Sequence, residues 1–205
     1  ELLNKYLEGE KIDDKIISET FKKAVVARQV IPVFAVSSAR NFGVDVLMDY
    51  INALLPSALD IPPVKAKVLN KDSEIEIKPA PDGPVLAYVF RTMADPYIGK
   101  LSIFRIFSGT IKVNSNYLIS SSNKTYKFTN LFKLQGKNQS DITEASCGDI
   151  IAVSKIMDII NDDTISTQDN PLKIPETRYL SPTLPKAVTP KSKGDEEKIS
   201  SGISK

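Results

Sequence analysis

The stretch AYVFRTMADPYIGKLSIFRIFSGTIK (87–112) decides the fold of this chain, because two long runs of strand-forming residues flank a break. The runs PVLAYVFRTM and KLSIFRIFSGTI are rich in β-branched and aromatic residues, which favour strands. The shorter runs SNYLISSS, KTYKFTNLFKL and GDIIAVSKI follow, with Gly, Asn, Ser and Asp between them, at intervals of about ten residues. This pattern predicts an all-β sandwich or small barrel beyond Pro84.

The residues before the barrel show a different periodicity. DDKIISETFKKAVVARQ (13–29) has apolar residues at the i, i+4, i+7 and i+8 spacing of a helix, with an Asp available as N-cap. VIPVFAV (30–36) is a nearly continuous apolar run, typical of a parallel strand covered on both faces. A second helical stripe runs from Val44 to Leu55 and stops at Pro56. Helix, strand and helix in this order are typical of the last part of a doubly wound α/β domain.

Composition narrows the classes of function. The 27 basic and 25 acidic residues give a net charge of +2, so no global basic field indicates nucleic acid, although local patches could. The chain has no histidine and one cysteine, which excludes a Ser-His-Asp or Cys-His nucleophile, a His-containing zinc site and an internal disulfide. No apolar run approaches the roughly 20 residues of a membrane helix, so we expect no membrane partner. We therefore expect this chain alone to have no catalytic activity.

The order of these segments resembles elongation factor G. VFAVSSARNFGVDVLMDYINALLPSALDIPP (33–63) is similar to the end of the GTP-binding domain of that family. The stretch at 87–112 resembles the opening of domain II, and EASCGDIIAVSKIMDIINDDTIS (144–166) resembles a later part of the same domain. VTPKSKGDEEKIS (188–200) is similar to the start of domain III. Other barrel segments look closer to the elongation-factor-G-like paralogues than to the main translocase, so the resemblance does not fix the paralogue.

The resemblance implies a fold class and a domain plan. We expect an α/β remnant, the end of a P-loop-type GTPase domain, followed by an all-β barrel of the translation-factor domain II type. The expected boundaries are the C-terminal part of the GTP-binding domain (1–60), a Pro-rich linker (61–83), the domain II barrel (84–180) and a truncated start of domain III (181–205).

The ends of the chain and its linker support this plan. The linker could add an edge hairpin, because charged residues alternate with Ile75 and Ile77. We expect a further strand at KAVTP (186–190) and then the opening turns of a helix. The chain begins without an initiator Met, as an excised segment would, so we expect both ends to be cuts through larger domains.

The resemblance also implies a guanine-contacting loop. In the family a Ser-Ala loop touches the guanine base, which carries over to Ser38 and Ala39, with Arg40 following. Ligands of open α/β sheets bind beyond the carboxyl ends of strands, where a backbone N–H can donate to the guanine carbonyl oxygen. Without the resemblance, the same residues describe an ordinary β–α turn.

GTP and Mg²⁺ are the cofactors that the resemblance implies for a full-length parent. In the family, the phosphate loop, the magnesium ligands, the Asn-Lys-x-Asp motif and the catalytic histidine lie upstream of this segment. None of these motifs occurs in the sequence. The parent is expected to be a GTPase, whereas this chain is expected to hold no bound cofactor and to be inactive.

The segment SSNKTYKFTNLFKLQGKNQ (121–139) interleaves lysines with aromatic residues. Lysines can neutralise phosphates and aromatic rings can stack on bases, so the segment could contact small-subunit ribosomal RNA. The candidate contacts are Lys124, Lys127, Lys133 and Lys137. Alternatively, strand alternation sends the aromatic rings into the core and the lysines into water, which we favour for the aromatics.

The turn IINDDT departs from the family pattern, because Asp162 stands where the family usually has Gly. Asp adopts left-handed turn conformations less readily than Gly but does tolerate them, so we expect the barrel to survive.

The expected function is that of a ribosome-dependent translational GTPase fragment, acting in the movement of transfer RNA and messenger RNA in the cytoplasm. Its expected partners are the ribosome, the rest of the GTP-binding domain and domains III–V of the same chain. Two alternatives remain open. One is a ribosomal protection or release-factor-type GTPase, and the other is a free-standing β-barrel module that binds RNA or protein.

Overall fold

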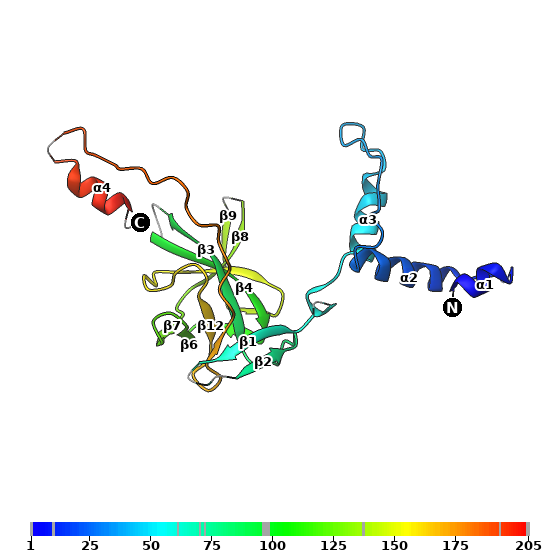
Figure 1. Ribbon diagram of the computed structural model, residues 1–205, viewed down its shortest axis with the longest axis horizontal. Helices are drawn as coiled ribbons and strands as arrows, with labels where there is room; N and C mark the ends of the chain where they lie inside the picture. The colour runs from blue at the N-terminus through cyan, green and yellow to red at the C-terminus, as the bar shows by residue number, and fades with distance from the viewer. Residues whose placement is uncertain are drawn as a thin grey trace. The chain divides into compact units, whose positions relative to one another are not determined.

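The structure is a computed structural model that divides the chain into two compact units, residues 1–60 and residues 61–205 (Figure 1). We call them the N-terminal unit and the barrel unit. The structure describes residues 2–9, 11–60, 62–69, 71, 73–95, 99–136, 138–192 and 194–203. Within this described part of the chain, no helix combines the length and the apolar character needed to cross a membrane.

The N-terminal unit is helical. Its elements are α1 (Leu2–Leu7), α2 (Asp14–Val26), α3 (Val44–Leu54) and the 3₁₀ turn η1 (Ala58–Asp60). Asp13 caps α2, because its side chain accepts a hydrogen bond from the backbone N–H of Lys15 at 2.9 Å. α3 ends two residues before Pro56, which cannot continue a helix. Both helices that the apolar spacing predicts are therefore present, and they contact each other.

The strand predicted at residues 30–36 is absent, and that prediction was wrong for this chain. The segment carries no ladder, and Ile31 and Val33 are 83% and 91% exposed. A parallel strand needs hydrogen-bonded neighbours on its edges. The described residues of the N-terminal unit contain no other strand that could supply them. An apolar run alone therefore did not suffice to make a strand.

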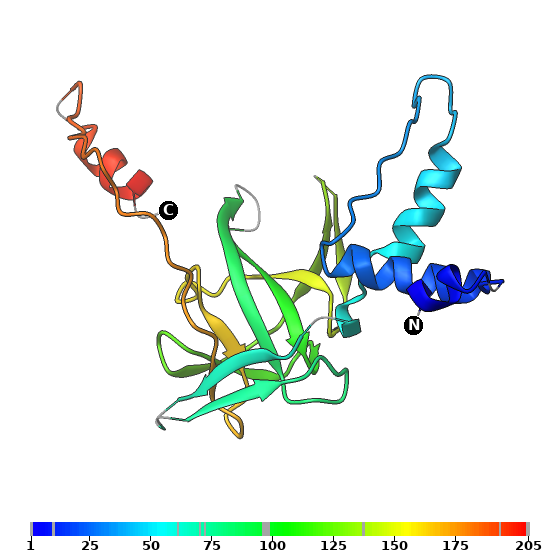
Figure 2. The same ribbon diagram turned by 45° about the vertical axis from the view of Figure 1, so that its right-hand side comes forward.

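The described residues of the barrel unit between 84 and 173 form strands and connecting loops, as the spacing of the apolar runs predicts. Its main sheet has eight antiparallel strands in the order β7-β6-β12-β3-β4-β11-β8-β9, and β5 pairs separately with β10. The two longest strands, β3 and β4, pair with each other and are the long green arrows of Figure 2. The strands are β3 (Leu86–Asp95), β4 (Gly99–Ser108), β5 (Thr110–Lys112), β6 (Asn116–Ile119), β7 (Lys124–Lys127), β8 (Leu131–Gln135), β9 (Asn138–Ile142), β10 (Glu144–Ser146), β11 (Ile150–Ser154) and β12 (Thr164–Ser166).

The barrel core forms around the inward faces of β3 and β4. Phe104 and Phe128 are fully buried there, and the Phe128 ring lies 4.8 Å from that of Tyr117 between centroids. Gly109, between β4 and β5, has a φ of 78°, and a Cβ at this position would lie 2.8 Å from the Cα of Val85. Only glycine fits such a close approach in the left-handed region. The glycine of the Ser-Gly-Thr in the opening stretch is thus a packing requirement.

Residues 61–83 were expected to be a linker that could add an edge hairpin, and they contain the hairpin β1 (Val64–Val68) and β2 (Glu74–Ile77). β1 also pairs with β13 (Leu172–Lys173), which makes a three-stranded sheet in the order β13-β1-β2. Ala66, Ile77, Leu86 and Leu172 form its buried cluster. Because Leu86 begins β3, this small sheet packs against the base of the barrel.

The C-terminal part of the barrel unit carries little regular structure. The strand predicted at KAVTP (186–190) is absent, since the residues there are all exposed and unpaired in any ladder. Pro185 and Pro190 flank a segment too short to bury a face, and proline also removes a ladder donor. The predicted helix is present as α4 (Glu196–Ile203).

Candidate functional site

The loop of Ser38, Ala39 and Arg40 is closed at its base by two backbone hydrogen bonds. The N–H of Ser37 donates to the carbonyl of Phe42 and the N–H of Phe42 donates back to Ser37, both at 3.0 Å. Ser38, Ala39 and Arg40 are all exposed. Within the described residues, their three backbone N–H groups have no acceptor. The loop therefore offers free donors beside small side chains.

Gly43 lets this loop fold back and start α3. Its φ is 70°, and a Cβ there would lie 3.2 Å from the carbonyl oxygen of Ala35. That contact is tighter than ordinary van der Waals packing, and the left-handed backbone would strain any other residue. The three residues predicted from the sequence, Ser38, Ala39 and Arg40, thus lie together on a defined turn just before the start of α3.

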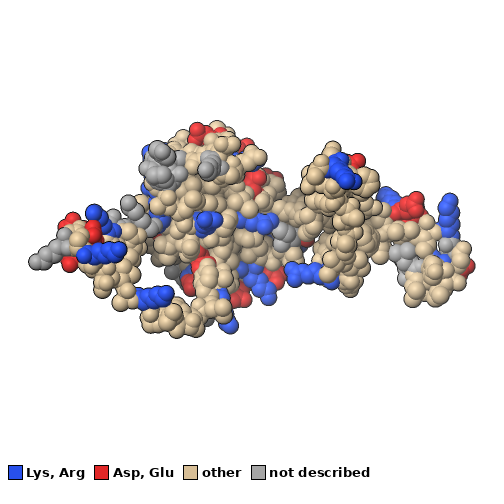
Figure 3. Space-filling model, turned by 90° about the horizontal axis from the view of Figure 1, so that it is seen from above, with Lys and Arg blue, Asp and Glu red and all other residues tan. Residues whose placement is uncertain are grey.

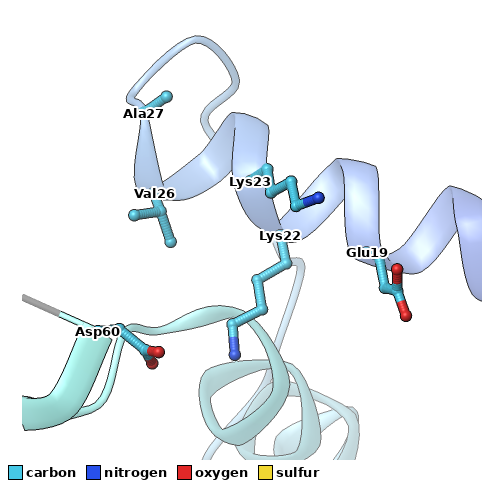
Figure 4. Close-up of a pocket in the computed structure, with 6 residues that line it drawn as sticks. All are labelled: Glu19, Lys22, Lys23, Val26, Ala27 and Asp60. Atoms are coloured by element: carbon cyan, nitrogen blue, oxygen red, sulfur yellow. The ribbon is translucent and has the colours of Figure 1, made fainter. Parts of the chain in front are cut away.

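The N-terminal unit also contains a shallow cavity of about 440 Å³ between α2 and η1 (Figure 4). Figure 4 shows the Lys22 side chain extending from α2 toward the carboxylate of Asp60. The pKa of Asp60 is lowered, first by the hydrogen bond from the Ser57 N–H at 2.8 Å and also by the charge of Lys22. Val26 and Ala27 line the apolar part of the cavity. These contacts stabilise the turn and do not assemble reactive groups.

The barrel lysines do not form one cluster. Lys124 and Lys127 lie on β7, at one end of the eight-strand order, and their odd spacing places them on opposite faces of that strand. Lys133 lies on β8, next to the other end of that order. These three side chains are exposed, and Lys137 lies outside the described residues. The face in Figure 3 shows basic and acidic residues interspersed.

The aromatic residues of this segment are used for packing. Phe128 is fully buried, and Tyr126 packs against the core while its hydroxyl donates to the carboxylate of Asp158. Phe132 is half-buried. The interpretation that strand alternation sends the aromatic rings inward is confirmed for Phe128.

Sequence reasoning missed a buried carboxylate, Asp163, which is 2% exposed. Its Oδ1 accepts from the N–H of Ser121 at 2.9 Å and from the hydroxyl of Ser120 at 3.2 Å. Its Oδ2 accepts from the hydroxyl of Ser121 at 3.0 Å and from the N–H of Ile160 at 2.8 Å. Four donors satisfy the carboxylate, so it joins the end of β6 to the turn before β12. The spacing of its residues along the chain gave no signal of this network, because Ser120 and Ser121 lie more than 40 residues before Asp163.

The neighbouring Asp162 has a φ of 69°, in the left-handed region. The barrel tolerates Asp in this turn, as predicted. The Asp162 N–H donates to the carbonyl of Val89 at 2.9 Å, and its carboxylate accepts from the hydroxyls of Tyr88 and Tyr179. The described residues contain no group of three metal-ligating side chains.

Comparisons with known proteins bear on the whole chain. Residues 84–168 match the protein family described as elongation factor G domain 2. Over 202 residues, 98% of the chain, the sequence is 33% identical to "Elongation factor G 2" of Syntrophomonas wolfei subsp. wolfei (strain DSM 2245B / Goettingen). The chain spans 29% of the length of that relative.

The fold agrees with a solved structure as well. A crystal structure of a protein from Thermus thermophilus superposes with a TM-score of 0.74 at 26% sequence identity. The superposition covers 98% of this chain and 28% of that one. The similarity in sequence and in fold therefore extends through both units and is not confined to the barrel. On these grounds residues 84–168 are an elongation factor G domain 2, and the whole chain is similar to one segment of an elongation factor G.

Proposed function

We propose that this chain is the part of a ribosome-dependent translational GTPase that carries the guanine-side loop and the domain II barrel. The parent protein would act in the movement of transfer RNA and messenger RNA during protein synthesis in the cytoplasm. The observation that carries this proposal is the similarity to elongation factor G over 98% of the chain. The barrel match at residues 84–168 supports it independently.

The N-terminal unit has the surface of part of a larger domain. Leu54 is the one apolar residue that its described helices bury. Large apolar side chains are exposed along all its segments, among them Leu7, Ile31, Val33, Phe42, Met48 and Leu59. Exposed apolar area of this extent marks an interaction surface. We assign it to packing against the rest of a GTP-binding domain.

The loop Ser38–Arg40 suits the guanine base and nothing more of the nucleotide. Its unpaired N–H groups can donate to a carbonyl oxygen, and the small side chains of Ser38 and Ala39 let a flat base approach. The sequence contains no phosphate loop to hold GTP and Mg²⁺. GTP hydrolysis therefore belongs to the longer parent, and this chain contributes one edge of the base site.

The barrel is the proposed ribosome-binding part. Lys124, Lys127 and Lys133 are exposed and form no ion pair within the described part of the chain. They are therefore available to neutralise phosphates of small-subunit ribosomal RNA. Because they are spread over both ends of the main sheet, they would contact RNA as separate points. Such point contacts position a protein without reading sequence.

A nucleotide titration tests the division of the GTP site. Fluorescent GTP added to the 205-residue chain should show no saturable binding below about 1 mM, which corresponds to a weak free energy of about −4 kcal/mol. Saturable binding in the micromolar range would contradict the proposal that the phosphate-binding half lies elsewhere.

A ribosome-binding assay tests the barrel. Binding of the chain to isolated small subunits should weaken steeply with salt, because lysine–phosphate contacts release counterions. The variant Lys124→Gln/Lys127→Gln should lower the slope by about 2 in a plot of log affinity against log salt. Lys198→Gln, on α4, is the matched control and should leave the slope unchanged. Binding that is insensitive to salt would point to protein contacts instead.

A further inference from the structure

The chain leaves the barrel along a path that the turn at Asp162 holds. After β13, residues 175–180 run over the surface past β3 (Figure 1). The last backbone anchor is the N–H of Ile174, which donates to the Thr164 hydroxyl at 2.8 Å. Beyond it, residues 175–180 are all exposed and have no strand or helix. Side chains hold this exit segment instead: the hydroxyl groups of Thr177 and Tyr179, and Glu176, which pairs with Lys173 of β13 at 2.7 Å.

Four side chains form the contact. The Tyr88 hydroxyl donates to Asp162 Oδ1, and Tyr179 donates to the same oxygen at 3.1 Å. The Thr177 hydroxyl lies 2.8 Å from the Tyr88 oxygen. Because Tyr88 gives its one proton to the carboxylate, Thr177 must donate to Tyr88. Tyr88 belongs to the barrel, whereas Thr177 and Tyr179 belong to the exit segment, so Asp162 is their common acceptor.

The surroundings keep this arrangement in place. The Asp162 N–H donates to Val89 and the Asp163 carboxylate fixes the same turn, so the acceptor is rigidly attached to β3 and β6. The hydrogen bond of Tyr179 to Asp162 raises the pKa of Tyr179. Burial first, and then its own hydrogen bond to Asp162, raise the pKa of Tyr88. Both tyrosines therefore stay protonated donors at neutral pH. Hydrogen bonds to a charged acceptor are stronger than neutral ones.

We propose that Tyr88, Asp162, Thr177 and Tyr179 form a clasp that sets the residue at which the chain becomes free of the barrel. With the clasp closed, the free chain begins at Leu180. With the clasp open, the contacts of Thr177 and Tyr179 are lost, and beyond the Ile174 anchor the exit segment keeps only the surface ion pair of Glu176 with Lys173 on β13. Residues 180–191 carry no helix or strand, so the clasp controls both the length and the direction of the tether between the barrel and α4. This inference does not depend on the proposed function.

The exit segment contains a trypsin cleavage site that can report whether the clasp is closed. Arg178 lies between the two clasp residues Thr177 and Tyr179, whereas Lys186 is exposed on the tether beyond them. Trypsin cleaves after both, and it needs a locally mobile chain. In the unaltered chain, cleavage at Arg178 should therefore be slower than cleavage at Lys186.

The clasp variants should speed cleavage at Arg178 alone. Asp162→Gly removes the carboxylate and suits the left-handed backbone of the turn, so it should raise the rate at Arg178 by about 10-fold. Tyr179→Phe removes one hydroxyl from a side chain that is 69% exposed, and it should raise the rate by about 2-fold to 10-fold without threatening the fold. Cleavage at Lys186 should not change in either variant.

Tyr126→Phe is the matched control, because it removes another tyrosine–aspartate hydrogen bond of the same barrel that touches no exit residue. It should leave the Arg178 to Lys186 ratio unchanged. Backbone order parameters for residues 176–179, measured by NMR, should fall in the clasp variants and stay high in the control. Equal cleavage of Arg178 and Lys186 in the unaltered chain, or an unchanged ratio in both clasp variants, would overturn the proposal.

Discussion

Asp163 and Ser121 lie 42 residues apart in sequence, yet the N–H of Ser121 donates to the Asp163 carboxylate at 2.9 Å and the Ser121 hydroxyl donates to the same group at 3.0 Å. This pair joins the end of β6 to the turn that leads into β12, two neighbours in the main sheet. Backbone N–H groups in a turn often have no backbone acceptor, and the Asp163 carboxylate serves as the acceptor here. Asp163 is therefore a structural centre of the barrel, and the adjacent Asp162 is free for its own contacts.

Asp163→Ala should destabilise the barrel by about 3 kcal/mol, because it leaves the N–H groups of Ser121 and Ile160 without their acceptor. Urea unfolding followed by circular dichroism measures the change. Asp169→Ala removes an exposed aspartate from the nearby bend and is expected to stay within about 0.5 kcal/mol of the unaltered chain. Equal costs for the two variants would show that the Asp163 contacts add nothing.

Gly109→Ala should lower the free energy of unfolding by about 2–4 kcal/mol, for two reasons. The new Cβ would lie 2.8 Å from the Val85 Cα, and alanine would have to adopt the unfavourable left-handed backbone conformation. Gly136→Ala separates the two effects. Gly136 also has a positive φ, of 60°, but a Cβ there meets nothing within 4 Å, so this variant should cost only about 1 kcal/mol. Chemical denaturation of both variants gives the difference. A similar loss at both sites would mean that backbone strain alone requires glycine at 109.

The long strands could be predicted from sequence because their signal is local. β3 and β4 each have ten residues with a continuous β-forming pattern, whereas β12 and β13 have three and two. Strands of two or three residues are too short to show an alternation of apolar and polar residues in the sequence. They form only because distant strands pair with them. The run at residues 30–36 failed for the converse reason, since a strand signal without neighbours makes no strand. The loop at Ser38 could be located through the family resemblance, but the Asp163 network could not, because its donors Ser120 and Ser121, which follow β6, are distant in sequence.

The two units should differ sharply in stability. The described helices of the N-terminal unit bury only Leu54, whereas the barrel core includes Phe104, Phe128 and Ile165, all fully buried. Burial of apolar area is the main stabilising contribution, so the helices should open far more readily than the strands. In hydrogen exchange of the 205-residue chain, amides of α2 and α3 should exchange at least about 100-fold faster than those of β3 and β4. Comparable protection in both units would show that the N-terminal helices are stable without further partners.

The clasp should also respond to alkaline pH, through Tyr179. Its hydrogen bond to Asp162 raises its pKa above the usual 10.0, so the protonated tyrosine is favoured in the folded chain. A group whose pKa is higher in the folded state contributes to stability. This contribution is complete at pH values below the pKa of the unfolded state and is lost as the pH rises through the pKa of the folded state. The NMR order parameters of residues 176–179 should thus stay high near neutral pH and fall as the pH rises through the raised pKa of Tyr179. In Asp162→Gly the pKa of Tyr179, followed by NMR, should fall back toward 10.0, and the order parameters should be low already at neutral pH. If the Tyr179 pKa is the same in Asp162→Gly and in the unaltered chain, Asp162 is not its acceptor in solution.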